Sequence, residues 1–598
     1  MRWGWVHFNV VSAVLLLLLA SNPCTALSSA AKESIPSVAS SGESTAIETS
    51  IGKQQHQPIH IKSTAAILNV NARAVNPPLI SLTRQILGDE NVHVTSTADE
   101  ARAAARHVIG DKYSLVIPMG GDGTLSAWID NLVEEVMLQD GVGEVEEAVG
   151  RLPVIGYVPR GTGNGLGHVI GCYEEAVTAK QTTGENVGSI ENKGFLSRIN
   201  PLSRRKQNRR ERTKQLLLRL KEVGDLLQQQ REIQSSGGVT NQGETTSSSQ
   251  LIQSKAEEIQ QHLSNKCTIV EMPMMQVIHR EDHATTSVSS NSTTQTDKGD
   301  LCFFAGSGFD SLMLHDFQQI KAWSSTSKSL PTFLKAALSS VAGYCVALVT
   351  LTLPQTLRYG THKICVKVTT RDEGALWIDH RRGDFAELAV KSGACNALGV
   401  ANGQAYDAHN GITNTEKKKV KHLLYSGTTG ILAASTTPYY GGGLRLFPYA
   451  RLIPNKLQLR LGRISPLVGF VNIPKIFEGS YREKSDKFGC LDFVGEEFDV
   501  EVSSPVYEEY LRRRRRRRGG KTRWWKRIRG KAAPNDDEKE KEVTTNGETN
   551  GSDATTTSGF PFQHSGESMG IKERFRLRVV KRPIRFVSFL RPRVIEDK

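Results

Sequence analysis

Short apolar runs and helically spaced apolar positions alternate along the first third of the chain. The apolar runs predict strands at residues 65–70, 92–95, 116–117 and 154–155. The helical spacing predicts helices at residues 78–87, 98–108 and 125–137. This alternation is typical of a doubly wound α/β domain built on a parallel sheet. We place that domain at residues 59–187.

The second half of the chain changes to short strands. These are predicted at residues 268–278, 301–304 and 363–368, and within 385–401 and 430–459. Such a series predicts a β-sandwich, which we place at residues 267–502 with a loop at 283–298. Strands at 575–580 and 584–590 predict a β-hairpin that closes the chain in residues 571–598.

Two strands of the predicted α/β domain end in glycine-rich loops. The first loop contains Gly120, Gly121, Asp122, Gly123 and Thr124. The second contains Pro159, Arg160, Gly161, Thr162, Gly163 and Asn164. Glycine lets backbone N–H groups approach a ligand closely, and the helix after the first loop favours an anion at its N-terminus. Because ligands of open α/β sheets gather beyond the carboxyl ends of the strands, the loops predict a nucleotide phosphate site. Ordinary connections between elements are the alternative.

These loops resemble the catalytic domain shared by diacylglycerol kinases, sphingosine kinases and related bacterial lipid kinases. Gly-Gly-Asp-Gly-Thr also occurs in NAD kinases and phosphofructokinases, whose nucleotide-binding fold is similar, whereas Gly-Thr-Gly-Asn is more specific to the lipid kinases. Gly165, directly after Asn164, is closer to the sphingoid-base branch. A triple glycine at 441–443, followed by Pro448 and Ala450, resembles a further signature of the family in its second domain.

The resemblance implies an ATP-dependent lipid kinase that uses Mg²⁺ and phosphorylates a sphingoid base or diacylglycerol. It implies nucleotide binding by Asn69, Gly120, Gly121, Asp122, Gly123, Thr124, Gly161, Thr162, Gly163 and Asn164. Asp122 is the expected metal ligand, and Asp122 and Glu496 are the expected catalytic carboxylates. Asp310 is expected to contact the lipid head group, with a plain turn before a helix as the alternative.

Two departures from the family pattern leave a different function open. Val494-Gly495-Glu496 stands where the family carries Asp-Gly-Glu, and Ile453-Pro454-Asn455 stands where bacterial relatives carry Asp-Asp-Gly. A catalytically weakened protein that binds lipid or membrane with the same fold is therefore one alternative. An NAD kinase is another, although the Gly-Thr-Gly-Asn loop and the triple glycine count against it.

The formal charge of the 598-residue chain is +14, and much of it lies in arginine-rich runs. Seven consecutive arginines, from Arg512 to Arg518, are followed by Trp524 and Trp525. Such a run attracts anionic bilayers, and tryptophan suits the lipid interface. We expect this segment to bind an anionic membrane surface rather than nucleic acid. The eight cysteines are scattered and predict neither a zinc site nor a disulfide framework.

Several segments fall outside the two predicted domains. Residues 1–26 fit a signal peptide or a signal anchor, which places the protein at the endoplasmic reticulum or another endomembrane, on either face. Residues 27–58 are expected to be a disordered linker, and 503–570 a polybasic and then acidic disordered insertion. Residues 188–266 are expected to be a basic, low-complexity insertion. Its leucines, such as Leu216 and Leu220, predict either a solvated helix or a helix on a membrane surface. The apolar run 336–353 favours a buried helix over a membrane-spanning one.

Overall fold

The structure is a computed structural model, and it describes only part of the chain. The described residues are 62–72, 74–161, 165–172, 201–237, 246–279, 299–327, 329–339, 341–379, 384–387, 421–440, 444–463, 468, 490–514 and 559–590. The predicted signal segment, the linker at 27–58, the loop at 283–298 and most of the polybasic and acidic segment lie outside them.

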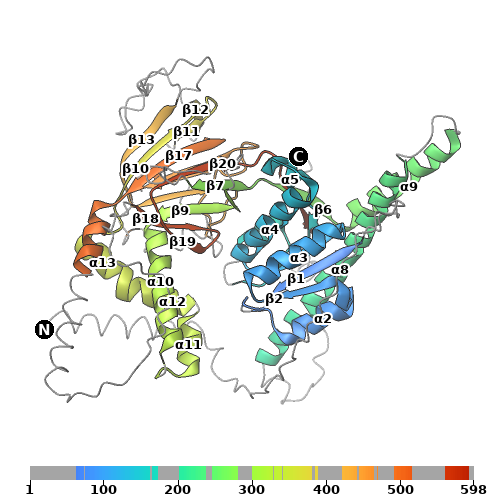
Figure 1. Cartoon of the computed structure of the whole chain (residues 1–598), viewed down its shortest axis with the longest axis horizontal. Coiled ribbons are helices and arrows are strands. Elements are labelled where there is room, and N and C mark those ends of the chain that lie inside the picture. The colour runs from blue at the N-terminus through green and yellow to red at the C-terminus, as the bar shows by residue number, and fades with distance from the viewer. Residues whose placement is uncertain are drawn as a thin grey trace, which may run out of the picture.

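A seven-stranded, mostly parallel sheet forms the first layer of the fold (Figure 1). Its strands are β1 (Thr64–Asn69), β2 (Val92–Thr95), β3 (Leu115–Gly120), β4 (Val154–Ile155), β5 (Val158–Pro159), β6 (Thr268–Met272) and β21 (Ile584–Ser588). The order along the sheet is β2-β1-β3-β4-β21-β6, and β5 pairs with β3. The strands β1 to β5 pair in parallel, as the alternation of strands and helices predicts.

Helices cover both faces of this sheet. They are α2 (Pro77–Leu87), α3 (Ala98–Gly110), α4 (Asp122–Asp140), α5 (Val145–Arg151) and α6 (Gly165–Ile170), with a 3-10 turn, η1, at Asp89–Asn91. Side chains of β1 alternate between the faces: Ala65 and Ile67 belong to the core that α3 and α4 cover, and Ala66 and Leu68 to the core under α2. The predicted start of the helix at residue 98 is confirmed, since Thr97 and Glu100 form a capping box that begins α3. Helix α4 begins at Asp122, three residues before the predicted start at 125.

A long helix from the predicted insertion completes the second face. Helix α8 (Pro201–Gly237) and helix α9 (Thr246–Lys266) form an antiparallel pair whose far end projects from the body (Figure 1). Leu217, Leu220 and Val223 of α8 are buried against the parallel sheet. Both predictions for this segment, a solvated helix and a membrane-surface helix, are therefore wrong for its apolar face, because the sheet covers it.

Two antiparallel sheets form the second half of the fold. The six-stranded sheet has the order β13-β10-β17-β20-β7-β8, and the eight-stranded sheet has the order β12-β11-β16-β15-β14-β9-β18-β19. Their side chains share one core, in which Val277 and Val500 of the first sheet pack with Leu459 and Phe562 of the second. The strands are β7 (Met275–His279), β8 (Asp300–Cys302), β9 (Phe304–Gly308), β10 (Ile364–Thr370), β11 (Leu376–Asp379), β12 (Asp384–Glu387), β13 (His422–Thr429), β14 (Ile431–Ser435), β15 (Leu457–Gly462), β16 (Cys490–Gly495), β17 (Glu497–Ser503), β18 (Phe560–His564), β19 (Glu567–Lys572) and β20 (Arg574–Val579).

Two pairs of strands connect the parallel sheet to the antiparallel ones. The predicted single strand at 268–278 is divided at Pro273 into β6 and β7, which lie in different sheets. The predicted closing hairpin is likewise wrong, because β20 pairs with β17 and β7, whereas β21 pairs with β4 and β6. The chain thus crosses between the two halves of the fold twice, along neighbouring strands.

Consecutive helices flank the antiparallel sheets. They are α10 (Phe309–Thr326), α11 (Thr332–Leu338), α12 (Val341–Ala347), the π-helix η3 (Leu348–Thr352) and α13 (Leu353–Tyr359), and a further helix spans residues 505–514. The apolar run at 336–353 is divided among α11, α12, η3 and the start of α13, so the single buried helix that we predicted is wrong in its extent. Among the described residues, no helix combines the length and the apolar character needed to cross a membrane.

Candidate active site

The two glycine loops lie against each other at the carboxyl ends of the parallel strands. Gly120 at the end of β3 pairs with Pro159 of β5, and the Gly120 carbonyl oxygen accepts the N–H groups of Arg160 at 2.6 Å and Gly161 at 3.0 Å. A methyl group on Gly121 would lie 3.1 Å from Cα of Gly161. Glycine is needed here because the backbones approach closely. Thr162, Gly163 and Asn164 lie outside the described residues.

Asn69 lies at the same edge of the sheet. It ends β1, whose neighbouring residue Leu68 is in register with Met119 of β3. The Asn69 side-chain oxygen accepts the N–H of Asn71 at 2.9 Å and thereby shapes the loop after the strand. The described residues predicted to bind nucleotide are thus brought to one edge, although their binding role stays a prediction.

Asp122 joins the two loops. It begins α4, and one carboxylate oxygen, Oδ2, accepts the N–H of Gly165 at 2.8 Å. The other oxygen, Oδ1, accepts longer hydrogen bonds from the N–H of Leu166 and the hydroxyl of Tyr157, at 3.4 and 3.3 Å. Burial raises the pKa of Asp122, and these hydrogen bonds oppose that effect. The side chain therefore serves to hold the second loop against the first.

The described residues contain no group of three or more His, Cys, Asp or Glu side chains that could hold a metal ion. This bears on the expected metal role of Asp122. Mg²⁺ in phosphotransfer sites is bound through one or two carboxylates together with substrate phosphates and water. Asp122 is only 6% exposed, and both of its carboxylate oxygens accept hydrogen bonds from the protein. Its role as a metal ligand stays a prediction, and a magnesium ion at this site would be held mainly by the nucleotide.

A carboxylate that the sequence analysis missed, Glu567, lies beside the first glycine loop. The turn between β18 and β19 packs against the start of α4, where a methyl group on Gly123 would lie 3.0 Å from the Ser565 carbonyl oxygen and 3.2 Å from Glu567 Oε1. The residue is exposed as a whole, but loss of water around its carboxylate raises the pKa of Glu567, against the charges of Lys321 and His564. A carboxylate with a raised pKa in this position is suited to accept a proton.

The signal that could have identified Glu567 is the tripeptide Ser565-Gly566-Glu567, which has the same X-Gly-Glu form as residues 494–496. Ser565 and Gly566 form the turn between the two strands, and both have positive φ, 49° and 82°. Such a turn is typical of a tight hairpin, where glycine tolerates the left-handed conformation. The hairpin thus presents Glu567 at its first position after the turn.

Glu496, the expected catalytic carboxylate, makes its recorded contacts elsewhere. It lies in the turn between β16 and β17, where its N–H donates to Asp372 at 2.8 Å and its Oε2 lies 3.5 Å from Lys581 Nζ. Val494, which replaces the family's Asp in our alignment, is a core residue packed with Ile378 and Tyr449. The catalytic role of Glu496 stays a prediction, and the X-Gly-Glu tripeptide that packs against the first glycine loop is residues 565–567.

Asp310 lies in the first turn of α10, next to a strained glycine. Gly308, with φ of 118°, ends β9 against the Gly430 carbonyl, and the chain turns there into the helix. Asp310 Oδ2 accepts hydrogen bonds from the Tyr440 hydroxyl and from Gln563 Nε2, the latter at 2.7 Å. Oδ1 is buried and has no hydrogen-bond partner, and burial raises the pKa of the group. The contact of Asp310 with a lipid head group stays a prediction.

Gln563 and Glu567 lie on the same β18–β19 hairpin. Because Gln563 binds the Asp310 carboxylate, this hairpin positions the carboxylates of both Asp310 and Glu567. Gln563 holds Asp310 from the middle of this hairpin, while Glu567 meets Gly123 at its end. The expected metal ligand, the expected substrate residue and the newly found carboxylate are thus linked through a short stretch of chain.

Comparisons with known proteins identify what the first part of the chain resembles. Residues 71–190 match the family described as the diacylglycerol kinase catalytic domain. Two solved structures from Bacillus anthracis str. Sterne are similar over most of their length. One, described as a candidate diacylglycerol kinase, has 10% identity and a TM-score of 0.36, and the match covers 91% of this chain and 99% of the other.

The second structure, described as a diacylglycerol kinase, has 10% identity and a TM-score of 0.31, with 89% of this chain and 98% of the other covered. No protein of curated description matches the chain. Because both TM-scores are low, the family assignment depends on the sequence match, which includes both glycine loops. Residues 71–190 are therefore similar to the catalytic domain of diacylglycerol kinases.

Proposed function

We propose that this protein is an ATP-dependent lipid kinase that phosphorylates a lipid hydroxyl, in a sphingoid base or a diacylglycerol. The observation that carries the proposal is the position of Glu567 beside Gly123, at the point where the two glycine loops meet. A phosphate-binding backbone and a carboxylate of raised pKa are thereby brought to one place. The catalytic domain match at residues 71–190 supports the same reaction class.

The loops would bind the nucleotide through their backbone. The first glycine loop suits a chain of phosphates, because glycine at 120, 121 and 123 leaves backbone N–H groups accessible. The 19-residue helix α4 also begins there, and its N-terminus favours an anion. Asp122 keeps the loops together through the N–H of Gly165. Bound ATP supplies the γ-phosphoryl group, and Mg²⁺ neutralises charge on the phosphates.

Glu567 and Asp310 would act on the lipid that accepts the phosphoryl group. The lipid hydroxyl oxygen forms a bond to the γ-phosphorus while the bond from that phosphorus to the β,γ-bridging oxygen breaks, and ADP leaves. Glu567 accepts the hydroxyl proton, and Asp310 orients the head group through its unpartnered Oδ1. Tyr440 and Gln563 hold the Asp310 carboxylate in place.

The test is transfer of radiolabelled γ-phosphate from ATP by the full chain. Diacylglycerol, sphingosine and other lipid alcohols are offered in mixed micelles, and NAD⁺ is offered separately. We expect a labelled lipid that requires Mg²⁺, and the acceptor in the panel names the substrate class. Formation of NADP would favour an NAD kinase instead. Binding of ATP without transfer to any lipid would favour a catalytically weakened protein of the same fold.

A further inference from the structure

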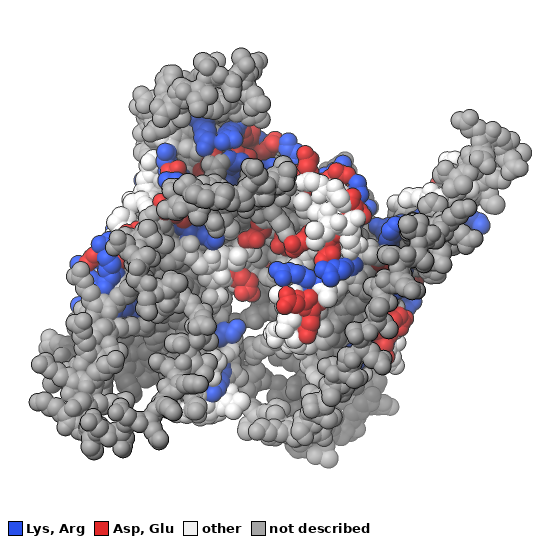
Figure 2. All heavy atoms as spheres, viewed as in Figure 1, with Lys and Arg blue, Asp and Glu red and all other residues white. Residues whose placement is uncertain are grey.

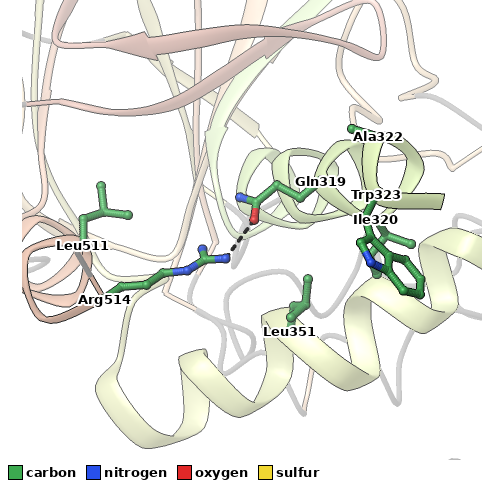
Figure 3. A pocket seen from close by; sticks show the side chains of 7 residues that line it. All are labelled: Gln319, Ile320, Ala322, Trp323, Leu351, Leu511 and Arg514. Carbon is green, nitrogen blue, oxygen red and sulfur yellow. Dashed lines mark hydrogen bonds between the residues drawn. The ribbon is translucent and has the colours of Figure 1, made fainter. Parts of the chain in front are cut away.

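An apolar groove lies on the flank of the antiparallel sheets, between α10, η3 and the helix of residues 505–514. Its volume is about 620 Å³. The walls are formed by Ile320 and Trp323 of α10, Leu351 of η3 and Leu511 of the last helix, and Gln319 and Arg514 supply the polar groups (Figure 3). A groove with apolar walls and one cationic group is suited to an amphiphile with a negative head.

Arg514 provides the cationic edge of this groove. Its guanidinium donates to Gln319 Oε1 at 3.0 Å (Figure 3), and its charge acts to lower the pKa of the nearby Asp316. The two preceding arginines lie on the same helix as Arg514. Arg512 forms an ion pair with Glu508 one turn earlier, and Arg513 forms one with Glu509. The first three arginines of the basic run are therefore helical. Residues 515–518, also arginines, lie outside the described residues.

Large apolar side chains are exposed around the groove. Trp323, Phe333 and Leu357 are 59%, 70% and 59% exposed, and they come from α10, α11 and α13. These helices and the helix of residues 505–514 lie together on one flank (Figure 1), where Figure 2 shows Lys and Arg side chains over α13 and its neighbour. Exposed apolar side chains beside basic ones are typical of a membrane-contacting surface.

The helices that carry this surface are fixed to one another by a buried polar contact. Asp316 of α10 accepts hydrogen bonds from the Thr352 hydroxyl at 2.8 Å and from Gln355 Nε2. Thr352 ends the π-helix, a conformation that is frequent at functional sites. The exposed side chains on α10 and α13 are consequently presented from one rigid platform.

We propose that this face is the membrane-docking surface of the protein, and that it binds an anionic phospholipid bilayer. Trp323, Phe333 and Leu357 enter the interface, and Arg514 contacts lipid phosphate at the mouth of the groove. The basic run alone would also suit nucleic acid, but the apolar walls and the exposed aromatic side chains favour lipid. Helix α10 carries Asp310 in its first turn and Trp323 in its last, about 20 Å apart along the axis, and so spans from the candidate active site to this face.

The experiment measures co-sedimentation of the full-length protein with vesicles of phosphatidylcholine, with and without phosphatidylserine, in the absence of ATP. The double variant Trp323→Ser/Phe333→Ser should bind anionic vesicles at least about tenfold more weakly. Arg514→Gln should lose about fivefold on the anionic vesicles. The controls are Leu138→Ser and Arg102→Gln, which change residues 68% and 56% exposed on the parallel-sheet half. Both controls should bind as the wild type does.

A second readout locates Trp323 directly. Brominated phosphatidylserine should quench part of the tryptophan fluorescence, and Trp323→Phe should lose a share of that quenching. Equal binding by the wild type and the groove variants would overturn the proposal. So would binding of single-stranded RNA with no binding to anionic vesicles. Because no assay uses ATP, loss of kinase activity would leave these results unchanged.

Discussion

The hydroxyl oxygens of Ser126 and Ser565 lie 2.7 Å apart, although 439 positions separate the two residues in the sequence. Both side chains are buried. Ser126 is in the second turn of α4, directly after the first glycine loop, and Ser565 is in the turn that precedes Glu567. This hydrogen bond therefore fixes the position of the candidate base relative to the phosphate-binding loop.

Removing that hydrogen bond should reduce turnover more than nucleotide affinity. We expect Ser126→Ala to lower kcat several-fold, with little change in KM for ATP, because the loops themselves are intact. The coupling free energy between Ser126→Ala and Ser565→Gly should be about 1 kcal/mol in a double-mutant cycle of unfolding. Steady-state kinetics and denaturant titration provide the two measurements. Strict additivity of the two substitutions would contradict the contact.

We expect Glu567 and Glu496 to differ strongly in their contribution to kcat. Glu567→Gln should lower kcat by about 10² to 10⁴, the usual effect of losing a general base. Glu496→Gln should leave kcat within about twofold, because this residue is 42% exposed and paired with Lys581. The pair is a matched comparison, since both substitutions remove one carboxylate charge at the point where two antiparallel strands connect. A large loss in Glu496→Gln alone would assign the catalytic role to Glu496, as the sequence analysis expects.

The parallel sheet and the meeting of the two glycine loops could be predicted from sequence because both follow from local patterns. Asn69 and Gly120 end neighbouring parallel strands, and Pro159 pairs beside them, so their loops must share an edge. Local patterns could not identify Glu567 as the candidate base. The X-Gly-Glu pattern occurs seven times in the sequence, and only long-range packing of the β18–β19 hairpin on α4 distinguishes residues 565–567 from the other copies.

The predictions for helix α8 and for the closing hairpin are also wrong because they depend on long-range packing. The leucines of α8 give an amphipathic pattern whether the apolar face meets a bilayer or a protein, and here Leu217 and Leu220 meet the parallel sheet. Residues 575–590 read locally as strand, turn and strand, yet β20 and β21 pair with different partners on either side of Pro583. Local periodicity defines an element and its apolar face, but the partner of that face depends on the rest of the chain.

Gly123 is predicted to be sensitive to the smallest possible substitution. In Gly123→Ala the new methyl group would lie 3.0 Å from the Ser565 carbonyl oxygen and 3.2 Å from Glu567 Cγ, so the β18–β19 turn would have to move. We expect kcat to fall about two- to tenfold, since the turn has to move by only part of the roughly 1 Å displacement that can cost about 10²-fold. Gly143→Ala is the control, because nothing lies within 4 Å of a methyl group at that position. Equal activity of the two variants would show that the hairpin does not need its present position.

Asp122→Asn should weaken the connection between the two loops. An amide nitrogen placed toward the N–H of Gly165 would set one donor against another, and rotation of the amide would lose the second acceptor. We expect a loss of about 1–3 kcal/mol in the free energy of unfolding, together with weaker ATP binding. Calorimetric titration with ATP, with and without Mg²⁺, checks this. If only the Mg²⁺-dependent part of binding changes, Asp122 acts as a metal ligand rather than as a link between loops.

Asp316 should make the stability of the protein depend on pH in a defined window. Burial raises the pKa of this carboxyl to about 6 from its ordinary 3.8, against hydrogen bonds from Thr352 and Gln355 and the charge of Arg514. The folded state thus binds the proton more tightly than the unfolded chain. The stabilising contribution is fully present below pH 3.8 and is lost as the pH rises through about 6. Relative to Asp316→Asn, whose amide stays neutral, the wild type should lose about 3 kcal/mol of unfolding free energy between these limits. Denaturant titrations at several pH values measure the difference. Asp89→Asn, at a side chain 83% exposed, is the control and should follow the wild-type profile. A constant difference between the wild type and Asp316→Asn would mean that the pKa of Asp316 is the same in the folded and the unfolded state.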